Sequence, residues 1–190
     1  MSFTKSGRFR KLLNNELNRI GPEEFKNSQK APFVIVLDNI RSQHNIGSAF
    51  RTADAFVVEK IVLCGICAVP PSAEIRKAAL GAEEIVTWEY EHDTLAAVAK
   101  LRDEGYIIVS VEQTENSIML YDFTPKDGER YALIFGNEVK GVAQEVVDMS
   151  DLTIEIPQSG TKHSLNVSVS IGVVLWEISI GNSVLRQRRQ

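Results

Sequence analysis

Short apolar runs alternate with stretches of helical periodicity along most of this chain, starting near residue 31. Six runs are predicted as buried strands, at residues 33–40, 59–65, 83–90, 106–112, 131–136 and 152–157. Apolar positions at helical spacing predict helices over residues 46–56, 72–79, 94–103, 143–148 and 165–180. Because strands alternate with helices, we expect an α/β fold with a mostly parallel six-stranded sheet flanked by helices.

The first thirty residues have a different pattern from the rest of the chain. Residues 8–20 carry apolar side chains at helical spacing, and Gly21-Pro22 is expected to end that helix. A second, shorter helix is predicted over residues 23–29. We therefore expect a basic helical N-terminal extension, residues 1–30, joined to one α/β domain, residues 31–190.

The composition is that of an ordinary globular domain, with 44% hydrophobic and 24% charged residues. No apolar run approaches the ~20 residues that a membrane-spanning helix needs, so no membrane partner is expected. The N-terminus lacks the apolar core of a secretory signal. With two cysteines and no export signal, the reducing cytoplasm is the expected compartment.

The net charge of −4 is distributed unevenly along the chain. Residues 1–30 carry +4 and the last ten residues carry +3, from Arg186, Arg188 and Arg189, whereas residues 31–180 carry −11. An acidic body with two basic ends is compatible with a polyanion that docks at those ends. Basic termini are also common as solvated tails, so the charge pattern alone leaves both interpretations open.

Several familiar motifs are absent or incomplete. No loop contains G-x-G-x-x-G, which argues against a dinucleotide-dependent oxidoreductase, and residues 136–141 lack the Lys-Ser/Thr of a triphosphate-binding loop. The pair Cys64 and Cys67 precedes Pro70-Pro71 rather than a helix, so we interpret it as two small core residues. The chain has three histidines, His44, His92 and His163. Since zinc would need further ligands, no metal site is expected.

Parallel sheets bind ligands at the loops that leave the carboxyl ends of their strands. After the first predicted strand, Asn45 lies where a loop enters a helix, and Arg51 follows about one and a half turns later. The asparagine could simply cap the helix. The helix has the composition of a buried element, and a buried arginine needs an anion or a hydrogen-bond partner.

Two later loops also contain candidate residues. After the fifth predicted strand, Gly136 and Gly141 would let the backbone approach a ligand closely, although a tight strand-to-helix turn also explains them. After the sixth, a polar stretch from Gln158 leads to Ser164 and Asn166 at a predicted helix start. Ser164 is a good helix N-cap, and the two side chains also place hydroxyl and amide groups beside a glycine-containing loop.

Three segments together resemble the signature motifs of the SpoU/TrmH branch of the SPOUT RNA methyltransferases. They are NIGSAFRTA (45–53), LIFGNEVKG (133–141) and IPQSGTKHSLNVSVS (156–170), in the order and with the separations typical of that family. The resemblance covers residues 33–180. Gln158 departs from it, since the family usually has Met at that position.

The resemblance implies a C-terminal trefoil knot, a rare exception to ordinary chain topology. It also implies that S-adenosylmethionine donates a methyl group to a ribose 2′-hydroxyl of tRNA or rRNA, without a metal. The family works as homodimers, and the apolar last helix around Trp176 is a candidate interface, although it could equally be core. The short N-terminal extension favours tRNA, with rRNA as the alternative. A non-catalytic RNA-binding protein on the same fold is the competing hypothesis.

The resemblance also assigns roles to residues. The expected cofactor-binding residues are Gly136, Asn137, Glu138, Gly141, Ile156, Gln158 and Leu165. The expected catalytic residues are Arg51, Asn45, Ser164 and Asn166. A free arginine is too basic to accept a proton near neutral pH. We therefore expect Arg51 to bind the adjacent phosphate and orient the nucleotide, with the other three positioning Arg51 and the ribose.

Overall fold

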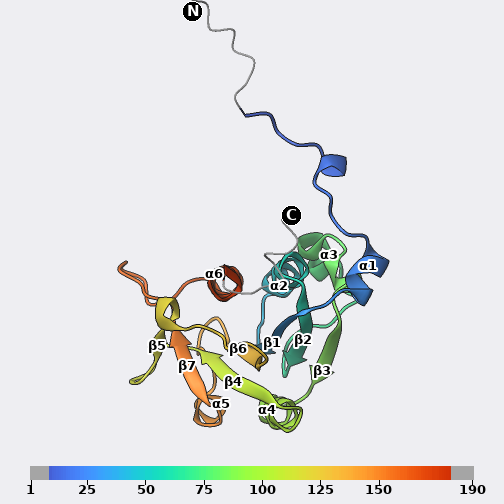
Figure 1. Ribbon diagram of the computed structural model, residues 1–190. Coiled ribbons are helices and arrows are strands. Elements are labelled where there is room, and N and C mark those ends of the chain that lie inside the picture. The colour runs from blue at the N-terminus through green and yellow to red at the C-terminus, as the bar shows by residue number, and fades with distance from the viewer. Residues whose placement is uncertain (1–8, 181–190) are drawn as a thin grey trace, which may run out of the picture.

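The computed structural model describes residues 9–180, which form a parallel sheet with helices on both faces (Figure 1). The strands are β1 (Ala31–Asp38), β2 (Val58–Cys64), β3 (Trp88–Glu91), β4 (Tyr106–Val111), β5 (Ile118–Met119), β6 (Arg130–Phe135) and β7 (Leu152–Glu155). Their order across the sheet is β3-β2-β1-β6-β4-β7-β5, and every pair is parallel. The predicted α/β class is confirmed, and the trefoil knot stays a prediction.

The strand count of six was wrong by one. β5 has only two residues, which pair with β7 at the edge of the sheet, so it leaves no apolar run in the sequence. The third predicted strand also begins later than expected, at Trp88, because residues 82–84 form a 3₁₀-helix, η2 (Ala82–Glu84).

The helices of the domain lie where the periodicity predicts them, within about three residues at each end. They are α2 (Gln43–Ala55), α3 (Ala73–Ala79), α4 (Thr94–Asp103), α5 (Gln144–Asp148) and α6 (Val167–Ile180). Two further short elements are α1 (Pro22–Asn27), which corresponds to the predicted second helix, and η3 (Leu120–Asp122). Arg186, Arg188 and Arg189 lie outside the described residues.

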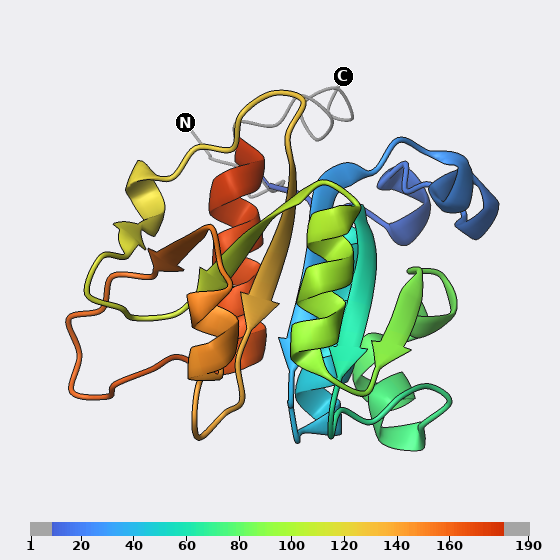
Figure 2. The same cartoon turned by 90° about the horizontal axis from the view of Figure 1, so that it is seen from below.

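The central strands are buried on both faces, which explains their continuous apolar runs. In β1, Phe33, Ile35 and Leu37 pack into the larger core cluster, beneath α2, α3 and α6. Val34 and Val36 point to the opposite face and pack beneath α4 and α5. Figure 2 shows α4 and α5 in front of the sheet and α6 behind it. This arrangement leaves the carboxyl ends of the strands free to carry a site.

The N-terminal extension differs from its prediction. Within residues 9–20 the only helical element is the 3₁₀-helix η1 (Asn14–Glu16), so the predicted helix over residues 8–20 is wrong. Its apolar side chains Phe9, Leu12, Leu13 and Leu17 are exposed, and Ile20 at its end packs against the core. Short helices are marginal in water unless an apolar face packs against the rest of the protein, and one packed residue at the end of the segment does not make such a face. Figure 1 shows it running away from the domain.

None of the helices between residues 9 and 180 is both long and apolar enough to cross a bilayer.

Candidate functional site

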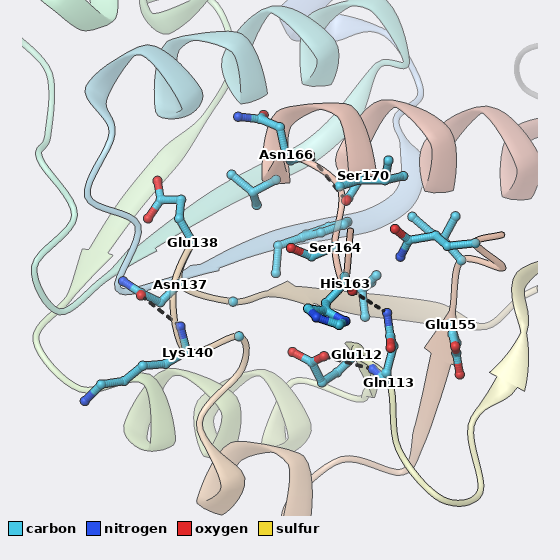
Figure 3. Close-up of a pocket in the computed structure, with 18 of the residues that line it drawn as sticks. Glu112, Gln113, Asn137, Glu138, Lys140, Glu155, His163, Ser164, Asn166 and Ser170 are labelled. Atoms are coloured by element: carbon cyan, nitrogen blue, oxygen red, sulfur yellow. Dashed lines mark hydrogen bonds between the residues drawn. The ribbon is translucent and has the colours of Figure 1, made fainter. Parts of the chain in front are cut away.

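A cavity of about 520 Å³ opens at the carboxyl ends of β4, β6 and β7 (Figure 3). All seven residues assigned to cofactor binding line it: Gly136, Asn137, Glu138, Gly141, Ile156, Gln158 and Leu165. Two of the four expected catalytic residues, Ser164 and Asn166, line it as well. The fold therefore brings together two loops that are separated by about fifteen residues in the sequence, with α5 and β7 between them.

The loop 136–141 is a tight turn held by its own hydrogen bonds. Asn137 and Gly141 exchange backbone hydrogen bonds, each of 2.9 Å, and the Asn137 side-chain amide donates to the Asn39 carbonyl at 2.6 Å. A Cβ on Gly136 would lie 2.0 Å from backbone atoms of Gly141 and Val142, so this close approach requires glycine. The turn and the pocket wall are thus the same structure.

Glu138 connects this loop to the start of α2. Its carboxylate accepts hydrogen bonds from the backbone N–H groups of Arg41 and Ser42 and from the Asn45 side chain, all at 3.1 Å. Burial opposes the charge of this carboxylate, but these N–H donors outweigh it and lower the pKa of Glu138 below its ordinary value. A charged Glu138 therefore locks two of the three motif segments together.

Asn45 also joins the third segment. Its side-chain oxygen accepts a hydrogen bond from the Asn166 amide at 3.2 Å, although 121 residues separate the two in sequence. Asn45 is 7% exposed and does not line the cavity. It contacts the site only through Glu138 and Asn166, which do line the cavity. The chain Glu138–Asn45–Asn166 thus holds the three motif segments at one place.

The helix caps differ from those considered from the sequence. The Ser42 hydroxyl, rather than Asn45, caps α2 by accepting from the Asn45 backbone N–H at 3.2 Å. At the start of α6, the Asn166 side-chain oxygen accepts from the Ser168 backbone N–H at 2.9 Å. Ser164 is therefore not the cap of α6, because that helix begins two residues later than predicted. This frees the Ser164 hydroxyl for the pocket.

Arg51 does not have the buried environment expected for it. Ala49, Phe50 and Ala53 turn toward the core, which places Arg51 on the exposed outer face of α2. Among the described residues its guanidinium has no hydrogen bond or ion pair, and it lies outside the cavity lining. The expectation of a buried arginine was wrong. An exposed guanidinium on α2 is instead free to meet an anion from solution.

The cavity also contains residues that the motifs did not indicate. Glu112 and Gln113 follow β4, and His163 and Lys140 lie in the two loops already described. The Glu112 carboxylate accepts from the backbone N–H groups of Val142 and Gln113, both at 2.9 Å. The Gln113 side chain donates to the His163 carbonyl at 3.0 Å. The position of Glu112 at the carboxyl end of a strand could have identified it from the sequence.

The two cysteines behave as core residues. Burial raises the pKa of the Cys64 thiol to about 12 and that of Cys67 to about 11, so neither is a ready nucleophile. The Cys67 sulfur accepts from the Ile40 backbone N–H and donates to the Leu37 carbonyl. No group of His, Cys, Asp or Glu side chains within residues 9–180 is arranged to hold a metal ion.

A ligand pocket at the carboxyl ends of an all-parallel sheet defines an α/β protein with a small-molecule site. Within that class, the chain matches the SpoU rRNA Methylase family over residues 32–176, and it belongs to that family. The match includes all three loops of the site. The predicted SpoU/TrmH membership is confirmed.

The names of similar proteins agree with this family. The 23S rRNA (guanosine-2′-O-)-methyltransferase RlmB of Pasteurella multocida is 32% identical over 163 residues, which cover 86% of this chain and 66% of RlmB. RlmB of Neisseria meningitidis is 30% identical over 152 residues, 80% of this chain and 60% of that protein. This chain spans 60–67% of the length of the first curated relatives that it matches.

Solved structures share the fold. The AdoMet-bound rRNA methyltransferase from Sinorhizobium meliloti has a TM-score of 0.74 at 26% identity, over 81% of this chain and 58% of that one. The TrmH/SpoU tRNA modifying enzyme of A. aeolicus has a TM-score of 0.73 at 25% identity, over 88% of this chain and 81% of that one.

Proposed function

We propose that this protein is an S-adenosylmethionine-dependent RNA methyltransferase that acts on a ribose 2′-hydroxyl of tRNA or rRNA, in the cytoplasm. One observation carries the proposal: two of the three motif segments line one cavity, and Asn45 of the first segment bonds to Glu138 and Asn166 of the other two. The relatives described above support the same reaction and the same cofactor.

The chemistry of the cavity fits a cationic cofactor. Three carboxylates line it, from Glu112, Glu138 and Glu155, against one cation, that of Lys140. S-adenosylmethionine carries a sulfonium and an ammonium group against a single carboxylate, so an acidic pocket favours its net positive charge. When bound, it would supply an electrophilic methyl group. The backbone of Gly136, Ile156 and Leu165 would hold it, with the other cavity residues assigned above beside them.

The protein side chains then orient the RNA. Arg51, exposed and without a partner among the described residues, would bind the phosphate beside the target ribose through two parallel N–H donors. Asn45, Ser164 and Asn166 would position the ribose. Arginine stays protonated near neutral pH, so we assign Arg51 an orienting role and not that of a proton acceptor.

The Arg51 role is tested by Arg51→Ala. We expect methyl transfer from tritiated cofactor to fall by at least about a hundredfold, since mispositioned reactants lose that much rate. Cofactor binding, measured by calorimetry, should stay within about twofold, because Arg51 lies outside the cavity. Arg51→Lys is the control, since it keeps the charge but loses the bidentate fork. Substantial activity in Arg51→Ala would show that the role is wrong.

Cofactor binding also separates catalysis from the competing RNA-binding hypothesis. A purified protein that binds RNA but shows no heat of binding with S-adenosylmethionine would be a non-catalytic module. The tRNA and rRNA alternatives are separated by mapping ribose methylation in cells with and without this gene.

We further propose that the protein is a homodimer through α6. Val169, Val173 and Trp176 lie at i, i+4 and i+7 on that helix and are 50%, 37% and 57% exposed. An exposed apolar stripe of this kind favours a second copy of the chain as its cover. Sedimentation should show a dimer at micromolar concentration and a monomer for Trp176→Glu. A monomeric parent protein would contradict this proposal.

A further inference from the structure

The basic residues of the domain fall into two groups. Residues 31–180 contain eleven Lys and Arg against twenty-two Asp and Glu. Six of the eleven form ion pairs: Lys60, Arg76, Lys100, Arg102, Lys126 and Arg130. Five have no side-chain ion pair or hydrogen bond within residues 9–180: Arg41, Arg51, Lys77, Lys140 and Lys162. In so acidic a domain, five cations without carboxylate partners require an explanation.

Three of these five lie in or next to the segments that form the cavity. Lys140 belongs to the loop 136–141 and lines the cavity, and Figure 3 shows its side chain extending outward, away from His163. Arg41 precedes α2, and its backbone N–H donates to Glu138, two residues from Lys140. Lys162 adjoins His163, a cavity-lining residue of the opposite loop. All three are exposed, as is Arg51 on α2.

The carboxylates of the cavity form no ion pair with these cations, and their hydrogen bonds go to backbone, amide or hydroxyl donors instead. Glu138 and Glu112 accept the backbone N–H groups described above. Glu155 accepts from the Ser117 hydroxyl at 2.8 Å. The site therefore has an acidic interior and a cationic edge. The interior suits a cationic cofactor, and the edge suits an anionic partner.

We propose that Arg41, Lys140 and Lys162 form, together with Arg51, a phosphate-docking rim that seats RNA over the cavity. The inference rests on the proposed function and adds the surface by which the substrate is held. The rim has cations on both loops, so it matches a polyanion that crosses the cavity mouth. The acidic remainder of the domain repels RNA and directs it to this rim.

Phosphate contacts have a measurable signature. Each phosphate that a cation neutralises adds about 0.7–0.9 to the slope of log affinity against log salt concentration. Because such contacts are independent of sequence, unfractionated tRNA is a suitable probe. The full-length protein is used, so any binding by the basic termini is present in every variant.

The test compares Arg41→Ala/Lys140→Ala/Lys162→Ala with Lys77→Ala. Lys77 is the matched control, since it is exposed and without an ion pair but lies on α3, outside both cavity loops. We expect the triple variant to bind tRNA at least about tenfold more weakly at low salt and to lose roughly two units of slope. Its affinity for S-adenosylmethionine should change far less than its affinity for tRNA, because the Lys140 side chain extends outward from the cavity. Lys77→Ala should match the parent protein.

The outcomes distinguish the rim from the function. If the triple variant keeps the parent's tRNA affinity and salt slope while methyl transfer persists, the rim is wrong and the proposed function stands. If Lys77→Ala loses as much affinity as the triple variant, binding is diffuse and the rim is again wrong. A parent protein that binds neither tRNA nor cofactor would overturn both proposals.

Discussion

The two loops that face each other across the cavity are held in very different ways. In the loop 136–141, the backbone is closed by two 2.9 Å hydrogen bonds, and the Glu138 carboxylate accepts three more from the start of α2. In the loop 156–166, every residue from Pro157 to Asn166 is exposed. Apart from the Asn166 bonds that begin α6, its described hydrogen bonds to the rest of the chain are that from Gln113 to the His163 carbonyl and that from Asn166 to Asn45, and Ile156 at its start packs against the core.

This difference suggests that the two loops have different roles in binding. A loop with most of its polar groups satisfied is preformed and contributes little motion to binding. A loop with few internal bonds has a low cost of local opening, and a ligand that contacts it must order it. We call the loop 136–141 the braced loop and the loop 156–166 the open loop. We infer that the braced loop sets where the cofactor binds and that the open loop closes over it.

The largest effect is expected for a glycine in the braced loop. In Gly136→Ala the added Cβ would meet backbone atoms 2.0 Å away, which cannot move as a side-chain tip could. We expect a loss of about 3 kcal/mol or more in the free energy of unfolding and no measurable cofactor binding. Chemical denaturation and calorimetry measure these.

Gly160→Ala is the matched change in the open loop. A Cβ there has nothing within 4 Å, and the free energy of unfolding should change by no more than about 0.5 kcal/mol. If the two variants lost the same stability, the contrast between the loops would be wrong.

The second prediction concerns hydrogen exchange of the backbone amides in the two loops. On addition of S-adenosylmethionine, amides of residues 158–164 should exchange hydrogen at least about tenfold more slowly, while those of 137–141 change little. Hydrogen exchange with mass spectrometry measures both loops in one sample. Equal protection of the two loops would show that the cofactor does not order one of them preferentially.

The third prediction concerns the charge of Glu138. Its pKa is lowered in the folded state from the ordinary 4.5, so its stabilisation is complete above pH 4.5 and is lost as the pH falls through the lower folded-state value. Glu138→Gln should therefore be less stable than the parent at pH 7, by about 1 kcal/mol for an exposed, hydrogen-bonded carboxylate. The difference should shrink on acidification below pH 4.5. Thermal unfolding from pH 3 to 7 tests this, and a pH-independent difference would contradict it.

The smallest effect on stability is expected for Asn166→Asp. A carboxylate keeps an acceptor for the Ser168 N–H, so the cap of α6 survives, but it cannot donate to Asn45. We expect a melting temperature within a few degrees of the parent and a clearly lower turnover. Asn166→Ala removes the cap as well, and serves as the comparison. Equal losses of stability and rate in Asn166→Asp would make Asn166 purely structural.

The strongest periodic patterns in the sequence were sufficient to predict the class of fold and the position of the site in it. Apolar runs identified the central strands, because those are buried on both faces, and the rule of carboxyl-end loops located the cavity. Signals that depend on tertiary contacts were missed. β5 is two residues long, and the segment 9–20 has helical periodicity, but of its apolar side chains only Ile20 packs against the core.

Two errors at the site have local causes. Arg51 was expected to be buried because its neighbours are apolar, but the helical register places Ala49, Phe50 and Ala53 on one face and Arg51 on the other. Ser164 was expected to cap α6, and a shift of two residues in the helix start gave that task to Asn166. Glu138 was assigned to the cofactor, and its bonds to Arg41, Ser42 and Asn45 are visible only in three dimensions.

The bond between Asn45 and Asn166 has a consequence for biosynthesis. Chain elongation proceeds from the N-terminus, so the first partner is made 121 residues before the second. Contacts this distant in sequence form late and slow folding, because a long loop must close before they stabilise anything. Core side chains of α6, including Ile171 and Leu175, likewise reach the central cluster only after that helix has been made. The cavity therefore lacks its second loop until the chain has been made as far as Asn166, and a product truncated before that residue would contain the loop 136–141 without the opposite wall of the cavity.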